Sequence, residues 1–97
     1  MYVVIFRAVI RRLDDEYYAV AARMRELAIN QFGCIEFHSV SEGCNEVSLS
    51  YWRTEESIRA WKYHPEHILA QHAGRERWYK SYSVEVTQIG RAYKSSI

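Results

Sequence analysis

Six segments with strand-like or helix-like patterns follow one another along this chain, and their order restricts the fold more than any other feature. Residues 2–9 are mostly β-branched or aromatic with Arg7 as the only charge, which is typical of a strand buried on at least one side. Residues 34–41 and 46–53 both alternate, and the short polar turn between them predicts a β-hairpin. A last alternating stretch at 79–89 predicts a fourth strand.

Two helical regions separate these strands. A run of three acidic residues, followed by apolar residues at three- and four-residue spacing, predicts a helix over about residues 14–31. Thr54 and the two glutamates after it predict a second helix start, and Pro65 opens a further helical segment that ends at Gly74. The order strand, helix, strand, strand, helix, strand predicts an α+β, ferredoxin-like βαββαβ fold, in which a four-stranded antiparallel sheet carries both helical regions on one face.

The length of 97 residues fits one domain with one hydrophobic core, so we expect a single domain over residues 1–97. The alternating strands leave the second face of the predicted sheet partly apolar. Such a face needs a cover. We therefore expect a second copy of the chain to pack against it, which makes the protein a homodimer.

Charge and cysteine content restrict the partners. With 13 Lys and Arg against 12 Asp and Glu, the chain has no basic patch that predicts nucleic acid or membrane binding. The apolar run at residues 3–6 is too short for a signal peptide or a membrane span, so we expect a cytoplasmic protein. The hairpin register places Cys34 and Cys44 on the order of 20 Å apart, too far for a disulfide. We expect two reduced thiols, and neither has a neighbouring histidine that would predict a nucleophile.

No nucleotide-binding, zinc-protease or nucleophile-elbow motif occurs in the sequence. The candidate residues form instead an aromatic and histidine-rich cluster between positions 51 and 82: Tyr51, Trp52, Trp61, Tyr63, His64, His67, His72, Trp78, Tyr79 and Tyr82. Two interpretations of this cluster stay open. The rings line a pocket for a planar ligand between the sheet and the second helical region, or they are core residues that pack the fold.

Three histidines within nine residues suggest a metal site, but helical geometry argues against one. At about 100° per residue, His64 and His67 lie some 60° apart and His72 lies about 140° from His67, so the three cannot converge on one ion. We expect no metal, and we expect His64 to cap the helix that begins at Pro65. The other interpretation makes His64 or His67 an acid or base at the mouth of the pocket.

Arg7 is unusual because a guanidinium in an apolar strand needs either solvent or an anionic partner. Glu85 on the last strand and Glu36 on the second are the candidates across the sheet. We favour such an ion pair over a role in binding an anionic ligand.

The segment SYWRTEESIRAWKYHPEH, residues 50–67, resembles the antibiotic biosynthesis monooxygenase family of dimeric α+β barrel proteins. The shared pattern is a strand that ends in Trp, two acidic residues at a helix start, a Trp inside that helix, and then His-Pro-x-His. The junction at residues 31–34 and the pairs at 70–71, 74–75 and 78–79 extend the likeness over nearly the whole chain.

This resemblance implies a homodimeric barrel with an apolar cavity between sheet and helices in each subunit. It further implies an oxygenase that works without metal or flavin, in which O₂ reacts with the anion of a small quinol- or anthrone-like compound. Such a site needs an apolar cavity, a group that takes up the ionising proton, and exclusion of water. The residues then assigned are His67 as base, His64 and Trp61 as further catalytic residues, and Trp52, Tyr82, Tyr51 and Arg7 as substrate-binding residues.

Two alternatives come from other classes of function. The family also contains haem-degrading enzymes, which use an Asn on the first strand; this chain has Arg7 there and no Asn in that strand, although His72 is available as a haem ligand. The other alternative is a non-catalytic dimeric module that binds a small ligand. Fold likeness alone does not decide between these functions.

Overall fold

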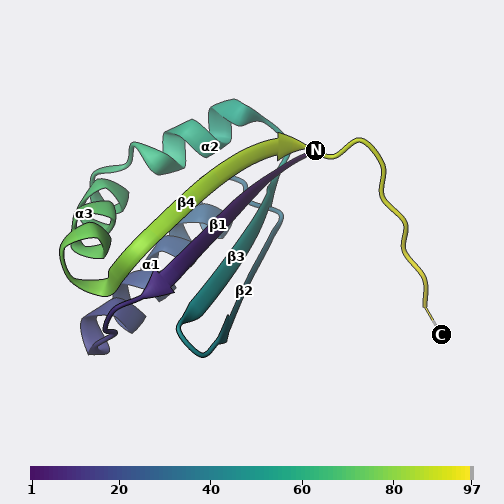
Figure 1. Ribbon diagram of the computed structural model, residues 1–97. Coiled ribbons are helices and arrows are strands. Elements are labelled where there is room, and N and C mark those ends of the chain that lie inside the picture. The colour runs from purple at the N-terminus through teal and green to yellow at the C-terminus, as the bar shows by residue number, and fades with distance from the viewer. Residues whose placement is uncertain (97) are drawn as a thin grey trace.

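The sheet of the computed structural model, which describes residues 1–96, has four antiparallel strands in the order β2-β3-β1-β4 (Figure 1). The strands are β1 (Tyr2–Ile10), β2 (Glu36–Glu42), β3 (Asn45–Trp52) and β4 (Tyr79–Gln88). The predicted hairpin is the β2-β3 pair, and β1 lies between β3 and β4. The predicted ferredoxin-like α+β fold is confirmed.

The helices lie together on one side of this sheet, as predicted (Figure 1). They are α1 (Asp15–Asn30), α2 (Glu55–Lys62) and α3 (Pro65–Ala73), and a π-helical turn, η1 (Gly74–Trp78), follows α3 directly. The π-helical turn was not predicted, because such turns are rare and carry no periodic sequence pattern. We call the covered side of the sheet the helix-facing side and the other the open side.

Side-chain caps fix where the helices begin. A carboxylate oxygen of Asp14 accepts a hydrogen bond of 2.8 Å from the backbone N–H of Tyr17 in the first turn of α1. At the start of α3, Nδ1 of His64 accepts a hydrogen bond of 3.1 Å from the backbone N–H of Glu66. Pro65 occupies the first turn, where its missing N–H costs nothing. The predicted capping role of His64 is thus confirmed.

The buried core lies between the sheet and the C-terminal half of α1. Its members are Val4, Met24, Leu27, Ala28, Cys34, Trp52, Ile58 and Trp61. Trp52, at the end of β3, is fully buried, and α2 contributes two of the eight residues. Core packing is therefore concentrated at one end of the sheet.

The strand register separates the two sides of the sheet. Val4 is a core residue and pairs with Ser50, so Glu46, Ser48, Ser50 and Trp52 share the helix-facing side of β3. The alternate residues of β3 are on the open side: Val47, Leu49 and Tyr51. Val40 of β2 pairs with Val47 and is 67% exposed there. The prediction of a partly apolar second face is confirmed.

The ion pair predicted for Arg7 exists on the open side, where its guanidinium contacts the carboxylate of Glu85 on β4.

Cys34 is buried and Cys44 is exposed, and both thiols are free, as predicted. Among residues 1–96, no helix has the length and apolar composition needed to cross a membrane.

Candidate functional site

A buried carboxylate lies between the sheet and the start of α1. Glu46 is 5% exposed, and its Oε1 accepts a hydrogen bond from the hydroxyl of Tyr17. Its Oε2 is also buried and has no hydrogen-bond partner among the described residues. An unpaired buried polar atom costs on the order of 1–3 kcal/mol. Such an atom in a folded protein calls for an explanation. One explanation is that a bound molecule supplies the hydrogen-bond donor.

Two tyrosines beside Glu46 keep their protons. Burial, followed by the hydrogen bond to Glu46, raises the pKa of Tyr17 well above its ordinary value. Burial, followed by the charge of Glu46, raises the pKa of Tyr79 in the same direction. Their ring centroids lie 6.2 Å apart with the rings nearly perpendicular. Both hydroxyls are therefore donors at any ordinary pH.

Further rings connect this carboxylate to the surface. The ring of Phe6 lies 5.4 Å from that of Tyr79 and stacks on that of Tyr82 at 5.7 Å. Tyr82 is 36% exposed. Stacked rings of this kind offer a flat apolar surface to a planar ligand. The ring of Trp78 packs edge-on against that of Tyr17, with 5.3 Å between their centroids. We call the whole set the Glu46 cluster: Phe6, Tyr17, Glu46, Trp78, Tyr79 and Tyr82.

The π-helical turn η1 sets the position of two of these rings. A Cβ atom on Gly74 would lie 2.9 Å from Cδ2 and Cε2 of Tyr79, so the tyrosine ring fills space that only glycine leaves free. The indole Nε1–H of Trp78, at the end of η1, donates a hydrogen bond of 3.2 Å to Asp14. The turn thereby fixes the end of the second helical region against the start of α1.

A second aromatic group lies at the other end of the helix-facing side, and we call it the Trp61 cluster: Phe37, Trp52, Trp61 and His67. The indole N–H of Trp52 donates to the hydroxyl of Ser50 at 2.8 Å, and that of Trp61 donates to the carbonyl oxygen of Met24 at 3.0 Å. Both tryptophan N–H groups are therefore used inside the fold. A ligand at this end meets ring surfaces and no free indole donor.

His67 packs against Trp61, with 4.3 Å between their ring centroids. The side-chain nitrogen of Gln71 donates to the carbonyl oxygen of Lys62 at 3.2 Å and also contacts Nδ1 of His67 at 2.9 Å. Since this nitrogen is a donor, Nδ1 of His67 is the acceptor, and the ring proton is on Nε2. Burial lowers the pKa of His67 to about 4. The imidazole is neutral near pH 7, and neither nitrogen is free to accept a proton.

The part of the helix-facing side between the two clusters is not covered by packed side chains. Ala21 lies on the same face of α1 as Tyr17 and Ala28, which are buried, yet Ala21 is exposed. Val84 and Val86 pair with helix-facing residues of β1 but are 49% and 44% exposed. The middle of this side is thus apolar and open to solvent, which suits a small apolar ligand.

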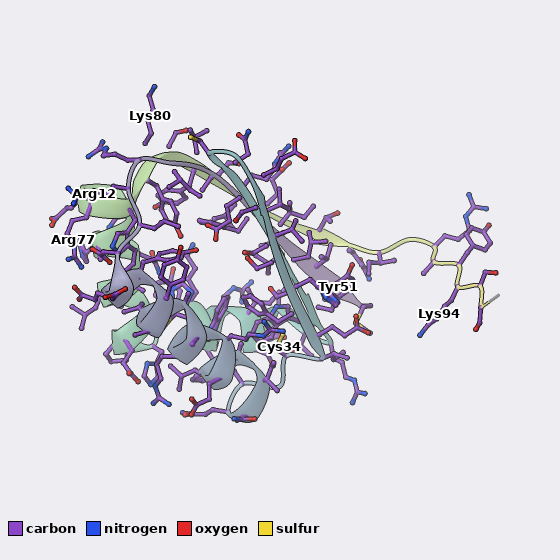
Figure 2. The ribbon with its side chains drawn as sticks, turned by 90° about the horizontal axis from the view of Figure 1, so that it is seen from below. Arg12, Cys34, Tyr51, Arg77, Lys80 and Lys94 are labelled. Atoms are coloured by element: carbon purple, nitrogen blue, oxygen red, sulfur yellow. The ribbon has the colours of Figure 1, made fainter. Side chains whose placement is uncertain are left out.

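Other predicted site residues lie elsewhere. Tyr51 and Arg7 are on the open side, and Figure 2 shows Tyr51 on the side of the sheet away from the helices, while Cys34 lies between the layers. His72 is on the exposed end of α3, where Nδ1 lies 3.4 Å from the guanidinium of Arg75. Within the described part of the chain, no three His, Cys, Asp or Glu side chains are grouped to hold a metal ion. The structure brings together Trp52, Trp61 and His67, with His64 capping the same helix and Tyr82 in the Glu46 cluster.

Glu46 and Tyr17 were not predicted as site residues. The available signal was the helix-facing series Glu46, Ser48, Ser50, which is polar although it lies under helices. A carboxylate at such a position is unusual, because charged residues are rarely buried without a partner.

The protein YqjZ of Bacillus subtilis (strain 168) is 38% identical over 91 residues, which cover 93% of this chain and 80% of YqjZ. Jasmonate monooxygenase ABM of Pyricularia oryzae is 32% identical over 85 residues, which cover 84% of this chain but 40% of that protein, so the chain spans less than half of its length. No protein-family model matches the chain.

Among solved structures, SnoaB of Streptomyces nogalater, a cofactor-independent oxygenase, superimposes with a TM-score of 0.81 at 14% identity and covers 97% of both chains. This likeness shows a shared fold. Together with the sequence relatives it identifies the class of protein: the chain belongs to the antibiotic biosynthesis monooxygenase family.

Proposed function

We propose that the protein is a monooxygenase that acts with O₂ on a small quinol- or anthrone-like compound, without a resident metal or flavin. Membership of the monooxygenase family and the shared fold with SnoaB, a cofactor-independent oxygenase, support this proposal. The observation that carries it is the apolar, solvent-open middle of the helix-facing side, with the Glu46 cluster at one end and the Trp61 cluster at the other. A planar ring fits between two such walls.

The proposed chemistry needs little from the protein beyond binding and ionisation. Removing a proton from the bound compound makes its ring electron-rich enough to react with O₂, and apolar walls keep water away from the anion. For an anthrone, the ring CH₂ becomes C=O, and the second oxygen atom leaves as water with both hydrogens. All electrons come from the substrate, so no external reductant takes part.

The predicted residues take the following roles in this proposal. Trp61 and Trp52 form one wall, and Tyr82 stacks on the substrate at the other. His67 closes the α3 end as a neutral ring rather than as the predicted base, because Gln71 occupies its acceptor nitrogen, and His64 caps the same helix. We further propose a homodimer in which a second copy covers the open side. Tyr51 and Arg7 then face the partner rather than the substrate.

Oxygen consumption tests the proposal. Anthrone and menadiol, a naphthoquinol, are supplied to the protein in the presence of a strong chelator, with autoxidation in buffer subtracted. We expect uptake that the chelator does not change, and a loss of about tenfold or more in kcat/KM for Tyr82→Ala, which lacks the stacking ring. Tyr63→Ala removes a ring that is 66% exposed, and it serves as the matched control. Uptake no faster than autoxidation with either compound would overturn the proposal.

One observation favours a second candidate, a non-catalytic module that binds a small ligand. Both indole N–H groups of the Trp61 cluster are bonded within the fold, as expected of core residues. A thermal shift caused by menadiol or anthrone without any O₂ uptake would support this candidate, since a ligand at 100 times its Kd adds about 2.7 kcal/mol to stability. A Soret band on titration with haemin would instead support the haem alternative.

A further inference from the structure

Residues 89–96, which follow β4, leave the body of the protein, and we call them the arm (Figure 1). The backbone N–H of Ile89 donates a hydrogen bond of 2.9 Å to the carbonyl oxygen of Met1, which fixes where the arm begins. Tyr93 of the arm is 85% exposed, and the guanidinium over its ring belongs to Arg91 of the same segment. Figure 2 shows the arm running away from the open side, with Lys94 far beyond the sheet. The arm therefore packs little against its own chain.

The strand β2 forms a free edge of the sheet. It is the outermost strand on its side and pairs with β3 alone. Near its start, Arg25 of α1 donates a hydrogen bond of 3.0 Å to the carbonyl oxygen of Phe37, whereas residues 38–42 are exposed. Backbone N–H and C=O groups along a free edge bind further extended chains, because they lack partners within their own sheet. The edge of β2 can therefore accept an added strand.

The arm and β2 carry opposite charges. Residues 89–96 include Arg91 and Lys94 and no acidic residue. The strand β2 includes Glu36 and Glu42 and neither lysine nor arginine. Between positions 1 and 96, neither of these glutamates is paired with a lysine or an arginine. The two segments are therefore complementary in charge as well as in backbone.

A second copy offers the arm a more direct route to β2 than its own chain does. In the strand order β2-β3-β1-β4, the arm starts three strand spacings from its own β2, about 14 Å, and would fold back over the side that the second copy covers. Facing sheets pack about 10 Å apart, and a two-fold axis along the strands places β4 of one copy opposite β2 of the other. Residues 90–96 reach up to about 24 Å, so they cross this gap and run beside about four residues of β2.

From these observations we propose that two copies exchange arms, so that residues 90–96 of each chain lie along the outer edge of β2 in the other. Arg91 and Lys94 then lie near Glu36 and Glu42 of the partner subunit, and backbone hydrogen bonds extend the partner's sheet by one strand. Because a two-fold contact is reciprocal, both free edges are covered at once. The inference deepens the proposed homodimer and rests on it, but it does not depend on the oxygenase reaction.

Charge reversal on the two segments tests the exchange. One variant reverses β2 with Glu36→Lys and Glu42→Lys, the other reverses the arm with Arg91→Glu and Lys94→Glu, and circular dichroism checks both folds. Either variant alone brings like charges together, so we expect its dimer dissociation constant to rise by about tenfold or more. When the two variants are mixed in equal amounts, both contacts match. We then expect native mass spectrometry to find clearly more heterodimer than random pairing gives.

The matched control is Arg11→Glu with Arg12→Glu, which reverses two exposed cations just after β1 and changes the net charge as the arm variant does. Mixed with the reversed β2 variant, it should form no more heterodimer than random pairing gives. A preference for heterodimers also requires contact between chains, because an arm bound to its own β2 would stay mismatched in every pairing. Random pairing of the arm and β2 variants, or a preference no greater than that of the control, would overturn the proposal.

A chain that ends after Gly90 separates this inference from the homodimer on which it rests. We expect the shortened chain to fold, because residues 91–96 lie outside every strand and helix of the described chain. Analytical ultracentrifugation should show dimers that dissociate about tenfold or more readily than those of wild type, since the added strand is lost. A dissociation constant equal to that of wild type would reject the arm exchange and leave the homodimer standing. A wild-type protein that is monomeric would reject both.

Discussion

The indole N–H of Trp61 donates a hydrogen bond of 3.0 Å to the main-chain carbonyl of Met24, and this bond joins α2 to α1. Both residues are 8% exposed, so neither partner can replace the bond with water. The contact therefore holds the second helical region against the first. It also fixes the tryptophan ring that forms one wall of the proposed site.

Replacing Trp61 with Phe should destabilise the fold. The variant removes a buried hydrogen bond, which contributes about 0.5–1.5 kcal/mol, and the smaller ring adds a packing loss. In a domain of this size each kcal/mol lowers Tm by about 4–8 °C, so we expect a fall of roughly 10 °C. Thermal unfolding measures it, with the exposed Tyr63→Phe as the unaffected control. A Tm within the error of wild type would show that this bond stabilises nothing.

His67 should make stability depend on pH in the weakly acidic range. Its pKa is near 6.5 in the unfolded chain and about 4 in the folded protein, because burial disfavours the charged ring. The unfolded chain therefore binds more protons as the pH falls from 6.5 to 4. This contribution to the free energy of unfolding is complete above pH 6.5 and is lost as the pH falls toward 4, by about 3 kcal/mol.

Urea denaturation at a series of pH values measures this dependence. We expect His67→Gln to flatten the loss of stability between pH 6.5 and 4 relative to wild type. His38→Gln, which replaces an exposed histidine, is measured under the same conditions as the matched control. Parallel curves for wild type and His67→Gln would mean that His67 is not buried as a neutral ring.

Gly74 should tolerate no side chain. A methyl group there meets the ring of Tyr79 at 2.9 Å, so Gly74→Ala displaces that ring and costs about 1–3 kcal/mol through overpacking. Gly90→Ala is the matched control, because nothing lies within 4 Å of its Cβ position. Chemical unfolding of the two variants gives the comparison. Equal stability would show that the π-helical turn adapts to the methyl group.

The open side should be the surface on which two copies meet. Val40 is 67% exposed, and Leu49 lies diagonally across from it on the neighbouring strand and is partly exposed, so an aspartate at each position adds charge to the open side. We expect Val40→Asp with Leu49→Asp to give a folded monomer where wild type is a dimer. Ser39→Asp, on the helix-facing side, should remain dimeric. Light scattering after gel filtration decides the matter, and a dimer in the double variant would place the interface elsewhere.

The order of strands and helices could be predicted because its signals are local. Caps at Asp14 and His64, and the proline at position 65, act within one helical turn. The turn glycines, Gly33 and Gly43, have φ angles of +81° and +58°, which favour glycine over other residues. Such features need no knowledge of distant contacts.

The side of the sheet that each residue faces could not be predicted in the same way. A period of two shows which residues of β3 share a side, but not which side the helices cover. Val47, Leu49 and Tyr51 form the apolar set, yet it is the polar set containing Glu46 that lies under the helices. Tyr17, which explains this, lies 29 residues earlier in the chain.

The aromatic and histidine-rich segment could be predicted to form a cluster, but its separation into two groups could not be predicted. The structure separates it into two groups at opposite ends of the helix-facing side, with Trp61 in one and Tyr82 in the other. That division depends on η1 and on the ring of Tyr79 packed against Gly74. Neither feature has a sequence pattern of its own.

The most direct test of a cofactor-independent monooxygenase follows the oxygen atoms. Anthrone is converted by the wild-type protein under isotopically labelled O₂ in ordinary water, with chelator present, and the product is analysed by mass spectrometry. A monooxygenase should give product with one labelled oxygen atom, in the newly formed carbonyl, faster than in buffer and more slowly in Tyr82→Ala. Product whose new carbonyl carries unlabelled oxygen, or that forms at the rate of autoxidation, would contradict a monooxygenase.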